Sequence, residues 1–426
     1  MSLFSVPNET NPIQEAFDRG LAPGGDLYEE LSALGDYPVT TEDEARSLAR
    51  GVTRLGYQLG ERGNDPILHL IAGLFQGVES LEAFEILRDE GLPALLKAFD
   101  ARLARSEEGS ADTLLFVLKV AGLYRVEEAV ERIEAAARKP VEPESMMWSV
   151  LFSVFDETHP YRSAVANRLR APIPEGFIGV AYLDLVNTMA REGYLGRHPF
   201  DTPEGIARLR EWLTTGTSSF ARSAATSLAF LSGPDREELL ALAMDHPSLT
   251  VQMEGAWAAG RLGSESALKF LARTCLDPGH ARTAIEHLAR LGREDLVPAQ
   301  AQAPDFQAVA ELASWLGDPA EYGHPPDSLE IVDSRTMYWP PASDQRRLWV
   351  VRYRYDPKPP DDPGESGVGL VGSITFSLSG QTSADMPPED VYALHCCWEL
   401  QVNKDPRAPD TISVEAGRRL LGETPL

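Results

Sequence analysis

Small and apolar residues between residues 218 and 297 recur with the spacing of one helix face. Three leucines, Leu231, Leu262 and Leu291, end three similar segments and lie 31 and 29 residues apart. The positions seven, six and three residues before each leucine are small or apolar: Ala224, Ala225 and Leu228, then Gly255, Ala256 and Ala259, then Ala284, Ile285 and Leu288. This spacing is typical of a helix that packs closely against a neighbour.

A second apolar helix is expected after each of these helices, beyond a turn that contains glycine. Residues 236–243 and 266–272 supply two of these partners. The repeating unit is therefore predicted to be a helical hairpin. It resembles the short bacterial HEAT-like repeat found in phycobilisome lyases, and AAGRLG at 258–263 and HLARLG at 287–292 are the best matches. The resemblance implies a mostly α fold, a right-handed α-solenoid of HEAT/armadillo-like helical hairpins. A small α+β domain is predicted to follow it, because the pattern changes near the C-terminus.

Four parts of the chain follow from this pattern. We expect an irregular N-terminal cap at 1–40, the solenoid at 41–317, a linker at 318–327 and the small domain at 328–426. Thr41 and Glu44 form a predicted capping box at the start of the first repeat helix. Four more helices are expected at 144–155, 161–170, 175–191 and 203–214, separated by proline-bearing turns because proline cannot continue a helix.

The period changes to two near the C-terminus, which indicates strands at 348–355 and 374–379. Trp349, Val351, Tyr353 and Tyr355 then share one face. We assign that face to the core, either within the small domain or against the last repeats. Residues 391–402 alternate like a strand, but acidic residues and prolines precede them as at a helix start, and we favour a helix.

The charge is strongly acidic. The chain carries 39 basic and 65 acidic residues, a net charge of −26, and residues 331–426 contribute only −4 of it. Such a surface repels phosphate backbones, so we expect no nucleic-acid partner. Three cysteines without framework spacing suggest reduced thiols, and no leader or membrane span of about 18 apolar residues is visible. We therefore expect a cytoplasmic protein that does not bind membranes.

Two short motifs invite a chemical interpretation. Residues 367–372 match GxGxxG, but a proline-rich loop precedes them and a strand follows, whereas a dinucleotide site needs a strand before and a helix after. We interpret this segment as a flexible lead-in to a strand. His395, Cys396 and Cys397 suggest zinc, yet no second ligand pair exists beyond residue 300, where His324 is the only other histidine. We expect a buried histidine beside inert thiols.

Deoxyhypusine hydroxylases are HEAT-repeat enzymes whose metal is held by His-Glu pairs in the first helix of several repeats. The matching positions here carry Met253-Glu254, Arg222-Ser223 and Arg282-Thr283, so no pair is intact. No catalytic residue, cofactor or metal site is predicted.

Acidic residues at the starts of the second helices are the candidate partner-binding residues: Glu127, Glu128, Glu237, Glu238, Glu265, Glu294 and Asp295. They would line a rim that attracts a basic partner, or they would only stabilise the helix dipole. The leading interpretation is a non-enzymatic scaffold that binds a protein or peptide along the concave face of the solenoid. The alternative is a bilin lyase or another chromophore-handling enzyme of HEAT-repeat type. A third idea is a small-ligand site between Trp349, Tyr353 and residues 391–402.

Overall fold

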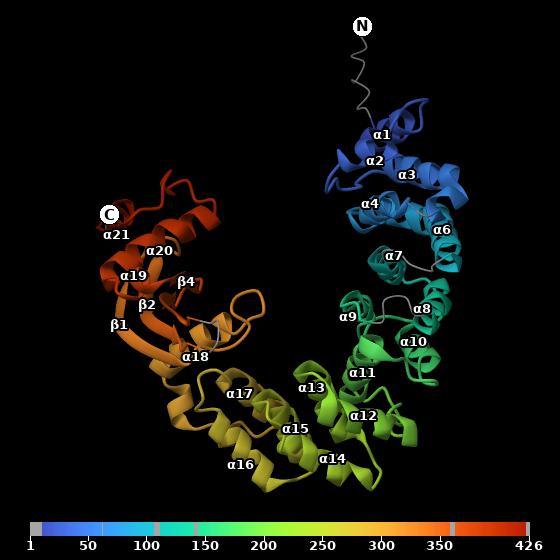
Figure 1. Ribbon diagram of the computed structural model, residues 1–426. Coiled ribbons are helices and arrows are strands. Elements are labelled where there is room, and N and C mark those ends of the chain that lie inside the picture. The colour runs from blue at the N-terminus through green and yellow to red at the C-terminus, as the bar shows by residue number, and fades with distance from the viewer. Residues whose placement is uncertain (1–10, 62, 106–110, 140–143, 358–362, 423–426) are drawn as a thin grey trace. The chain divides into compact units, whose positions relative to one another are not determined.

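The computed structural model describes residues 11–61, 63–105, 111–139, 144–357 and 363–422. Helices make up 61% of the chain, and a small antiparallel sheet of four strands lies near the C-terminus (Figure 1). The expectation of a mostly helical chain with a small α+β part is confirmed. No helix among the described residues is both long and apolar enough to cross a bilayer. Residues 1–10 of the expected N-terminal cap lie outside the described part of the chain.

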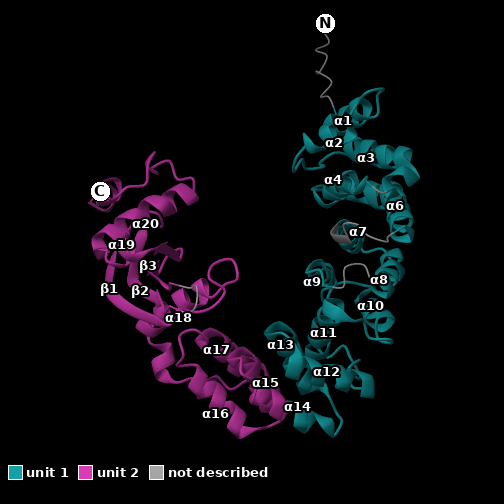
Figure 2. Ribbon diagram, in the orientation of Figure 1, with its two compact units in different colours: residues 1–239 teal, residues 240–426 magenta. Residues whose placement is uncertain are grey.

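The chain divides into two compact units, residues 1–239 and 240–426 (Figure 2). The described part of the first unit is built from helices, apart from an isolated β-bridge between Val39 and Val78. Its α-helices are α1 (Pro12–Gly20), α2 (Leu27–Ser32), α3 (Glu42–Leu55), α4 (Asp65–Gln76), α5 (Leu81–Ile86), α6 (Leu92–Ala104), α7 (Ala111–Leu123), α8 (Glu128–Arg138), α9 (Met147–Ser153), α10 (Arg162–Arg168), α11 (Gly176–Arg191), α12 (Pro203–Thr215) and α13 (Ser218–Ser227). The boundary falls within α14 (Asp235–Met244).

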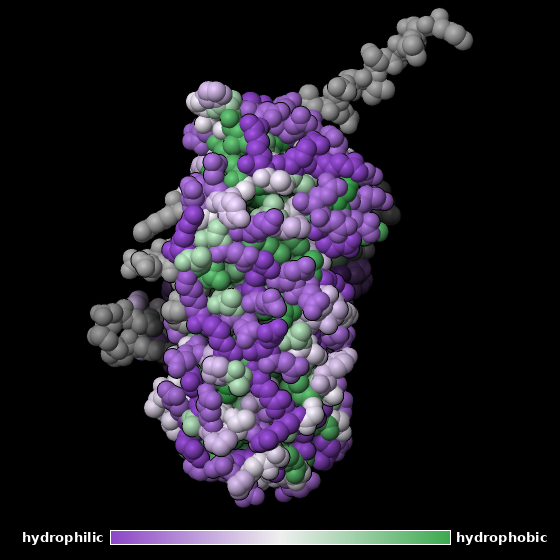
Figure 3. Space-filling view, turned by 90° about the vertical axis from the view of Figure 1, so that its right-hand side faces the viewer, coloured by the Kyte–Doolittle hydropathy of each residue, from purple (hydrophilic) through white to green (hydrophobic). Residues whose placement is uncertain are grey.

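The helices of the first unit form two rows. In one row α4, α7, α9, α11 and α13 each contact the next, and α6, α8, α10 and α12 form the other row (Figure 2). The side of the molecule on which the second row lies is mostly hydrophilic, with hydrophobic residues in scattered patches (Figure 3).

Local sequence signals place the helix starts of this unit. The Thr41 hydroxyl accepts from the Glu44 amide at 3.3 Å, and the Glu44 carboxylate accepts from the Thr41 amide at 2.9 Å. The predicted capping box is therefore confirmed. The four helices expected between residues 144 and 214 are also present, as α9 to α12.

The second unit begins with helices and ends with the sheet and the helices that follow it. Its elements are α15 (Leu249–Arg261), α16 (Glu265–Thr274), α17 (Ala281–Arg290), α18 (Pro304–Leu316), β1 (Ser328–Trp339), β2 (Asp344–Tyr355), β3 (Glu365–Val371), β4 (Phe376–Ser379), α19 (Gln381–Ala384), α20 (Pro388–Val402) and α21 (Val414–Gly422). Helices α15, α16 and α17 share a core that includes Met253, Leu271 and Leu288. The strands pair in the order β1-β2-β3-β4, all antiparallel.

Both faces of the sheet are buried. Val351, Tyr353 and Tyr355 pack against α18, so the face that the alternation assigned to the core lies on the last helix before the sheet. Leu348 and Val350 point to the other face and pack with residues of α20. The expectation of a helix at 391–402 is confirmed by α20.

The interpretation of residues 367–372 as a flexible lead-in is wrong. Residues 365–371 are strand β3, which lies between β2 and β4 and has five buried residues. The alternation that marks a half-buried strand is missing here because both faces of β3 are covered. No helix follows the glycines, as we expected when we set the dinucleotide interpretation aside.

Candidate functional site

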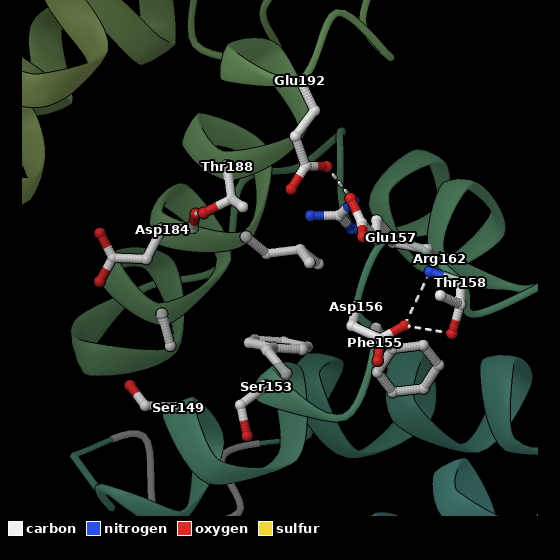
Figure 4. A pocket seen from close by; sticks show the side chains of 13 residues that line it. Ser149, Ser153, Phe155, Asp156, Glu157, Thr158, Arg162, Asp184, Thr188 and Glu192 are labelled. Carbon is white, nitrogen blue, oxygen red and sulfur yellow. Dashed lines mark hydrogen bonds and ion pairs between the residues drawn. The ribbon is translucent and has the colours of Figure 1, made fainter. Parts of the chain in front are cut away.

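A pocket of about 520 Å³ lies between α9 and α11 in the first unit (Figure 4). Helix α9, the turn after it, α10 and α11 supply its lining: Ser149, Phe152, Ser153, Phe155, Asp156, Glu157, Thr158, Arg162, Ala181, Asp184, Leu185, Thr188 and Glu192. Phe152, Phe155, Ala181 and Leu185 are buried and make its apolar part. The other lining residues are hydroxyls and charged groups. The pocket therefore combines an apolar floor with a polar rim, as ligand sites commonly do.

The turn after α9 is held in place by its own hydrogen bonds. The Asp156 carboxylate accepts from the Thr158 amide and hydroxyl, both at 2.8 Å. These bonds lower the pKa of Asp156, so its carboxylate is charged at neutral pH. Arg125, just beyond α7, donates to the Thr158 hydroxyl at 2.7 Å and joins the turn to the preceding hairpin. Two acidic residues of the pocket, Asp156 and Glu157, thus lie on an ordered turn.

His159 also holds this turn in place through hydrogen bonds of its ring. Its Nδ1 accepts from the Tyr161 amide at 3.2 Å, which places the proton on Nε2, and Nε2 donates to the Gly122 carbonyl at 2.9 Å. Burial lowers the pKa of His159 and keeps the ring neutral. Both ring nitrogens are engaged, so His159 positions the turn and is not a free base.

An ion pair joins α10 to the end of α11 at the pocket. The Arg162 guanidinium, 6% exposed, pairs with Glu192, the residue that follows α11 (Figure 4). The Thr188 hydroxyl donates to the Asp184 carbonyl within α11 at 3.0 Å. Besides Glu192, which pairs with the guanidinium of the lining, the pocket is lined by the carboxylates of Asp156, Glu157 and Asp184.

This arrangement favours a ligand with an apolar stem and a positive end. The lining contains four carboxylates against one guanidinium, a net charge of −3. A cation that enters would gain from this field, and its stem would cover the buried phenylalanine rings. The polar groups of the lining are carboxylates, hydroxyls and one guanidinium.

The seven acidic residues singled out in the sequence lie elsewhere. They are exposed, at or near the starts of α8, α14, α16 and a 3-10 turn at Glu294–Leu296. Some are paired with arginine: Glu238 with Arg210 at 3.0 Å, and Asp295 and Glu265 with Arg293 at 3.0 and 3.8 Å. None of the seven is among the described residues of the pocket. Their role in partner binding stays a prediction.

His395 belongs to a buried polar network of the second unit. Its Nε2 lies 3.2 Å from a Glu399 carboxylate oxygen, and Trp339 and Ser373 donate to the same carboxylate at 2.9 and 2.7 Å. His395 is fully buried, and burial lowers its pKa. Burial also raises the pKa of the Cys396 thiol to about 12, so this thiol is protonated and inert at neutral pH. Within the described ranges, no three His, Cys, Asp or Glu side chains are grouped to hold a metal.

The small-ligand site imagined between Trp349, Tyr353 and residues 391–402 is excluded by the sheet. Tyr353 faces α18, whereas α20 covers the opposite face. The Trp349 indole donates to Asp305, at the start of α18, at 2.8 Å. The side chains of Trp349 and Tyr353 lie on one face of the sheet and α20 lies on the other, because successive residues of a strand point to opposite faces. These two parts therefore cannot line one site.

Sequence reasoning missed the pocket because its walls come from two segments about thirty residues apart. One local signal was present: Asp-x-Thr at 156–158, directly after an apolar helix, is typical of a side-chain-capped turn. None of the family models, curated proteins and solved structures with which the chain was compared matches it.

Proposed function

We propose that the chain is a non-enzymatic interaction protein that binds a basic protein or peptide segment. In this proposal residues 41–317 form a right-handed α-solenoid of HEAT/armadillo-like hairpins, and the partner lies along its concave face. The repeat spacing of Leu231, Leu262 and Leu291 and the two helix rows of the first unit support the architecture. The acidic pocket between α9 and α11 is the observation that carries the function.

A lysine side chain has the chemistry that the pocket favours. Its four methylene groups would lie on the rings of Phe152 and Phe155, and its ammonium group would reach Asp156, Glu157 and Asp184 at the rim. A flexible stem with a compact charge suits scattered carboxylates better than the planar guanidinium of arginine, which favours two-pronged contacts. We therefore expect lysine as the anchor of the partner.

The test compares matched peptides. Three fluorescein-labelled peptides of twelve residues consist of leucine and alanine and differ only at the central position. That position is lysine in the first peptide, norleucine in the second and arginine in the third. Norleucine keeps the stem and removes the charge. We expect the lysine peptide to bind best in an anisotropy titration, and we expect its affinity to fall with added salt because the attraction is electrostatic.

Variants of the protein locate the site. The triple variant Asp156→Asn, Glu157→Gln, Asp184→Asn should raise Kd for the lysine peptide by about tenfold, because it removes three of the four carboxylates of the lining. Glu82→Gln, Glu85→Gln and Glu90→Gln together make a control with the same change in net charge on exposed residues outside the pocket. Equal Kd values for the two triple variants, or equal binding of the lysine and norleucine peptides, would show that the pocket is not the anchor.

A further inference from the structure

A small pocket of the first unit, between α1 and α3, is lined by two arginines. Its volume is about 220 Å³, several times the roughly 30 Å³ that one water molecule occupies in the liquid. The polar side chains of its lining are those of Gln14, Asp18, Ser47, Arg50 and Arg54. The pocket shares no lining residue with the α9–α11 pocket, so it is a separate site.

The two helices that form this pocket are tied to each other. A Cβ on Gly51 of α3 would lie 2.5 Å from the Phe17 ring of α1, so the helices touch at this glycine. The Asn11 amide, at the start of α1, donates to the Ser47 hydroxyl at 3.0 Å and to the Asp43 carboxylate at 2.8 Å. The walls of the pocket are therefore fixed relative to each other.

The two arginines of the lining lack a carboxylate partner. Arg50 and Arg54 lie one helical turn apart on α3, and among the described residues neither pairs with an acidic side chain. Arg50 donates instead to the Ser47 hydroxyl at 2.9 Å. On the same helix Arg46 pairs with Glu42 at 2.7 Å. Like charges at this spacing destabilise a helix, so a source of negative charge beside them would be favourable.

The helix dipole accounts for only one of these two arginines. Arg54 lies in the last turn of α3, where a cation stabilises the partial negative charge of the helix end. Arg50 lies a full turn earlier, and the effect of the dipole falls off within the last turn. The position of Arg50 beside a second cation therefore needs another reason, and a bound anion would supply it.

The strongly acidic character of the chain does not reach into this pocket. Charges are screened over about 8 Å at physiological ionic strength, so a small anion responds mainly to the lining. Glu15 and Glu30, the acidic residues nearby, both pair with Arg19, at 3.2 and 2.8 Å. The lining itself has two guanidinium groups against the single carboxylate of Asp18, a net charge of +1. A nucleic acid differs, because its long phosphate backbone meets the whole acidic surface.

A phosphate group matches the donors of this lining. Each guanidinium presents parallel N–H groups that bond two oxygens of one anion. A single guanidinium satisfies both oxygens of a carboxylate, whereas a phosphate monoester has three free oxygens and accepts from two guanidiniums. The Gln14 amide, exposed on α1, is a further donor at the pocket.

We infer that the α1–α3 pocket binds the phosphate group of a small molecule, inorganic phosphate or a phosphate monoester, through Arg50 and Arg54. The site differs in place and in charge from the acidic pocket of the proposed function. It stands whether or not that pocket binds lysine.

The experiment follows 4-fluorophenyl phosphate by ¹⁹F NMR with the full chain, at an ionic strength held at about 0.15 M with NaCl. Both arginines are exposed, so we expect Kd on the order of 1 mM. We expect 4-fluorobenzoate to bind at least about threefold more weakly and 4-fluorophenol at least about tenfold more weakly, because the first offers only a carboxylate and the second no anion. Competition by inorganic phosphate distinguishes the two sources: the phosphate compound with the lower Kd is the better ligand.

Three variants test the location. Arg50→Gln with Arg54→Gln should raise Kd for 4-fluorophenyl phosphate by at least about tenfold. Arg222→Gln with Arg273→Gln, which change the net charge equally at exposed positions outside the pocket, should leave Kd within about twofold. Asp18→Asn removes the carboxylate of the lining and should lower Kd by about threefold. Such a gain cannot result from a loss of folding, and circular dichroism checks the fold of the other variants.

Three outcomes would overturn the phosphate site. Equal Kd values for the wild type and the Arg50→Gln, Arg54→Gln variant would show that the anion binds elsewhere. Equal binding of 4-fluorophenol would show that the ring, and not the phosphate, is recognised. An unchanged or higher Kd in Asp18→Asn would show that the anion does not enter this pocket.

Discussion

At the scale of single residues, three histidines share one role that the sequence repeats as His-Pro-x. His159, His198 and His246 each accept a hydrogen bond at Nδ1 from the amide two residues later, at 3.2, 3.3 and 3.0 Å. His198 also has its Nε2 at 3.2 Å from the Asn187 amide oxygen. A histidine that accepts at Nδ1 must be neutral, because the protonated ring has only donors.

This role makes the stability of the fold depend on pH. Burial lowers the pKa of His198 to about 4, from an ordinary value of 6.5. Between these two values the unfolded chain binds a proton that the folded chain does not. The unfolding free energy should therefore fall as pH falls below 6.5, by about 1.4 kcal/mol for each pH unit from this residue alone. Urea unfolding at pH 7.0, 6.0 and 5.0 measures the slope.

His198→Asn separates this residue from the other titrating groups. The asparagine oxygen can accept from the Phe200 amide as in an Asx turn, and it does not titrate. The variant should lose less stability than the wild type between pH 7 and pH 5, although it is less stable at pH 7. Identical pH slopes for the two proteins would show that His198 is not the titrating group.

At the scale of elements, the glycines of β3 are explained by close packing. A Cβ on Gly367 would lie 2.3 Å from the Leu378 carbonyl oxygen and 2.4 Å from the Tyr353 hydroxyl. A Cβ on Gly369 would lie 2.6 Å from a Leu312 methyl of α18. The GxGxxG pattern thus reflects a strand that lies close to its neighbours, and a phosphate site is not needed to account for it.

Gly367→Ala should therefore destabilise the second unit. The new methyl group meets backbone of β4, which cannot move without shifting the sheet, and we expect a loss of about 1–3 kcal/mol. Gly73→Ala in α4 is the matched control, because its Cβ would meet nothing within 4 Å. Alanine favours a helix interior over glycine, so this control should gain about 0.5–1 kcal/mol. Thermal unfolding measures the stability of both variants. A Gly367→Ala variant as stable as the wild type would contradict the packing argument.

At the scale of the whole molecule, charge opposes folding. The chain carries a net charge of −26, and many of the ion pairs among its described residues, such as Arg46 with Glu42, join two exposed side chains. Exposed pairs contribute little, about 0–1 kcal/mol each, whereas the excess of carboxylates repels itself throughout the compact state.

Added salt should therefore stabilise the protein. The Debye length falls from about 30 Å at 0.01 M to about 6 Å near 0.3 M, which screens repulsion between distant carboxylates more than attraction within close pairs. We expect Tm to rise from 0.01 to 0.3 M NaCl at pH 7.5 and to rise equally in KCl. A falling Tm would mean that the arginine pairs, and not the net charge, dominate the electrostatics.

The sequence by itself determined what depends on local period and on helix ends. The capping box of Thr41 and Glu44 predicted the start of α3. The acidic and proline-rich segment before residues 391–402 correctly predicted the helix α20, although these residues alternate like a strand. The alternation along β2 predicted that Val351, Tyr353 and Tyr355 share a buried face. These features are readable because neighbours within one or two turns of chain decide them. Buried His395 beside protonated thiols was also predictable, since residue type and spacing offered no second ligand pair.

Only the tertiary structure decided which surfaces meet. Strand β1 escaped prediction because a bulge between Ile331 and Asp333 moves its odd-numbered residues from the α18 face to the α20 face, and no single alternation spans it. The α9–α11 pocket joins two segments about thirty residues apart along the chain. Its acidity and shape arise from side chains that no local pattern connects, because packing between helices brings them together.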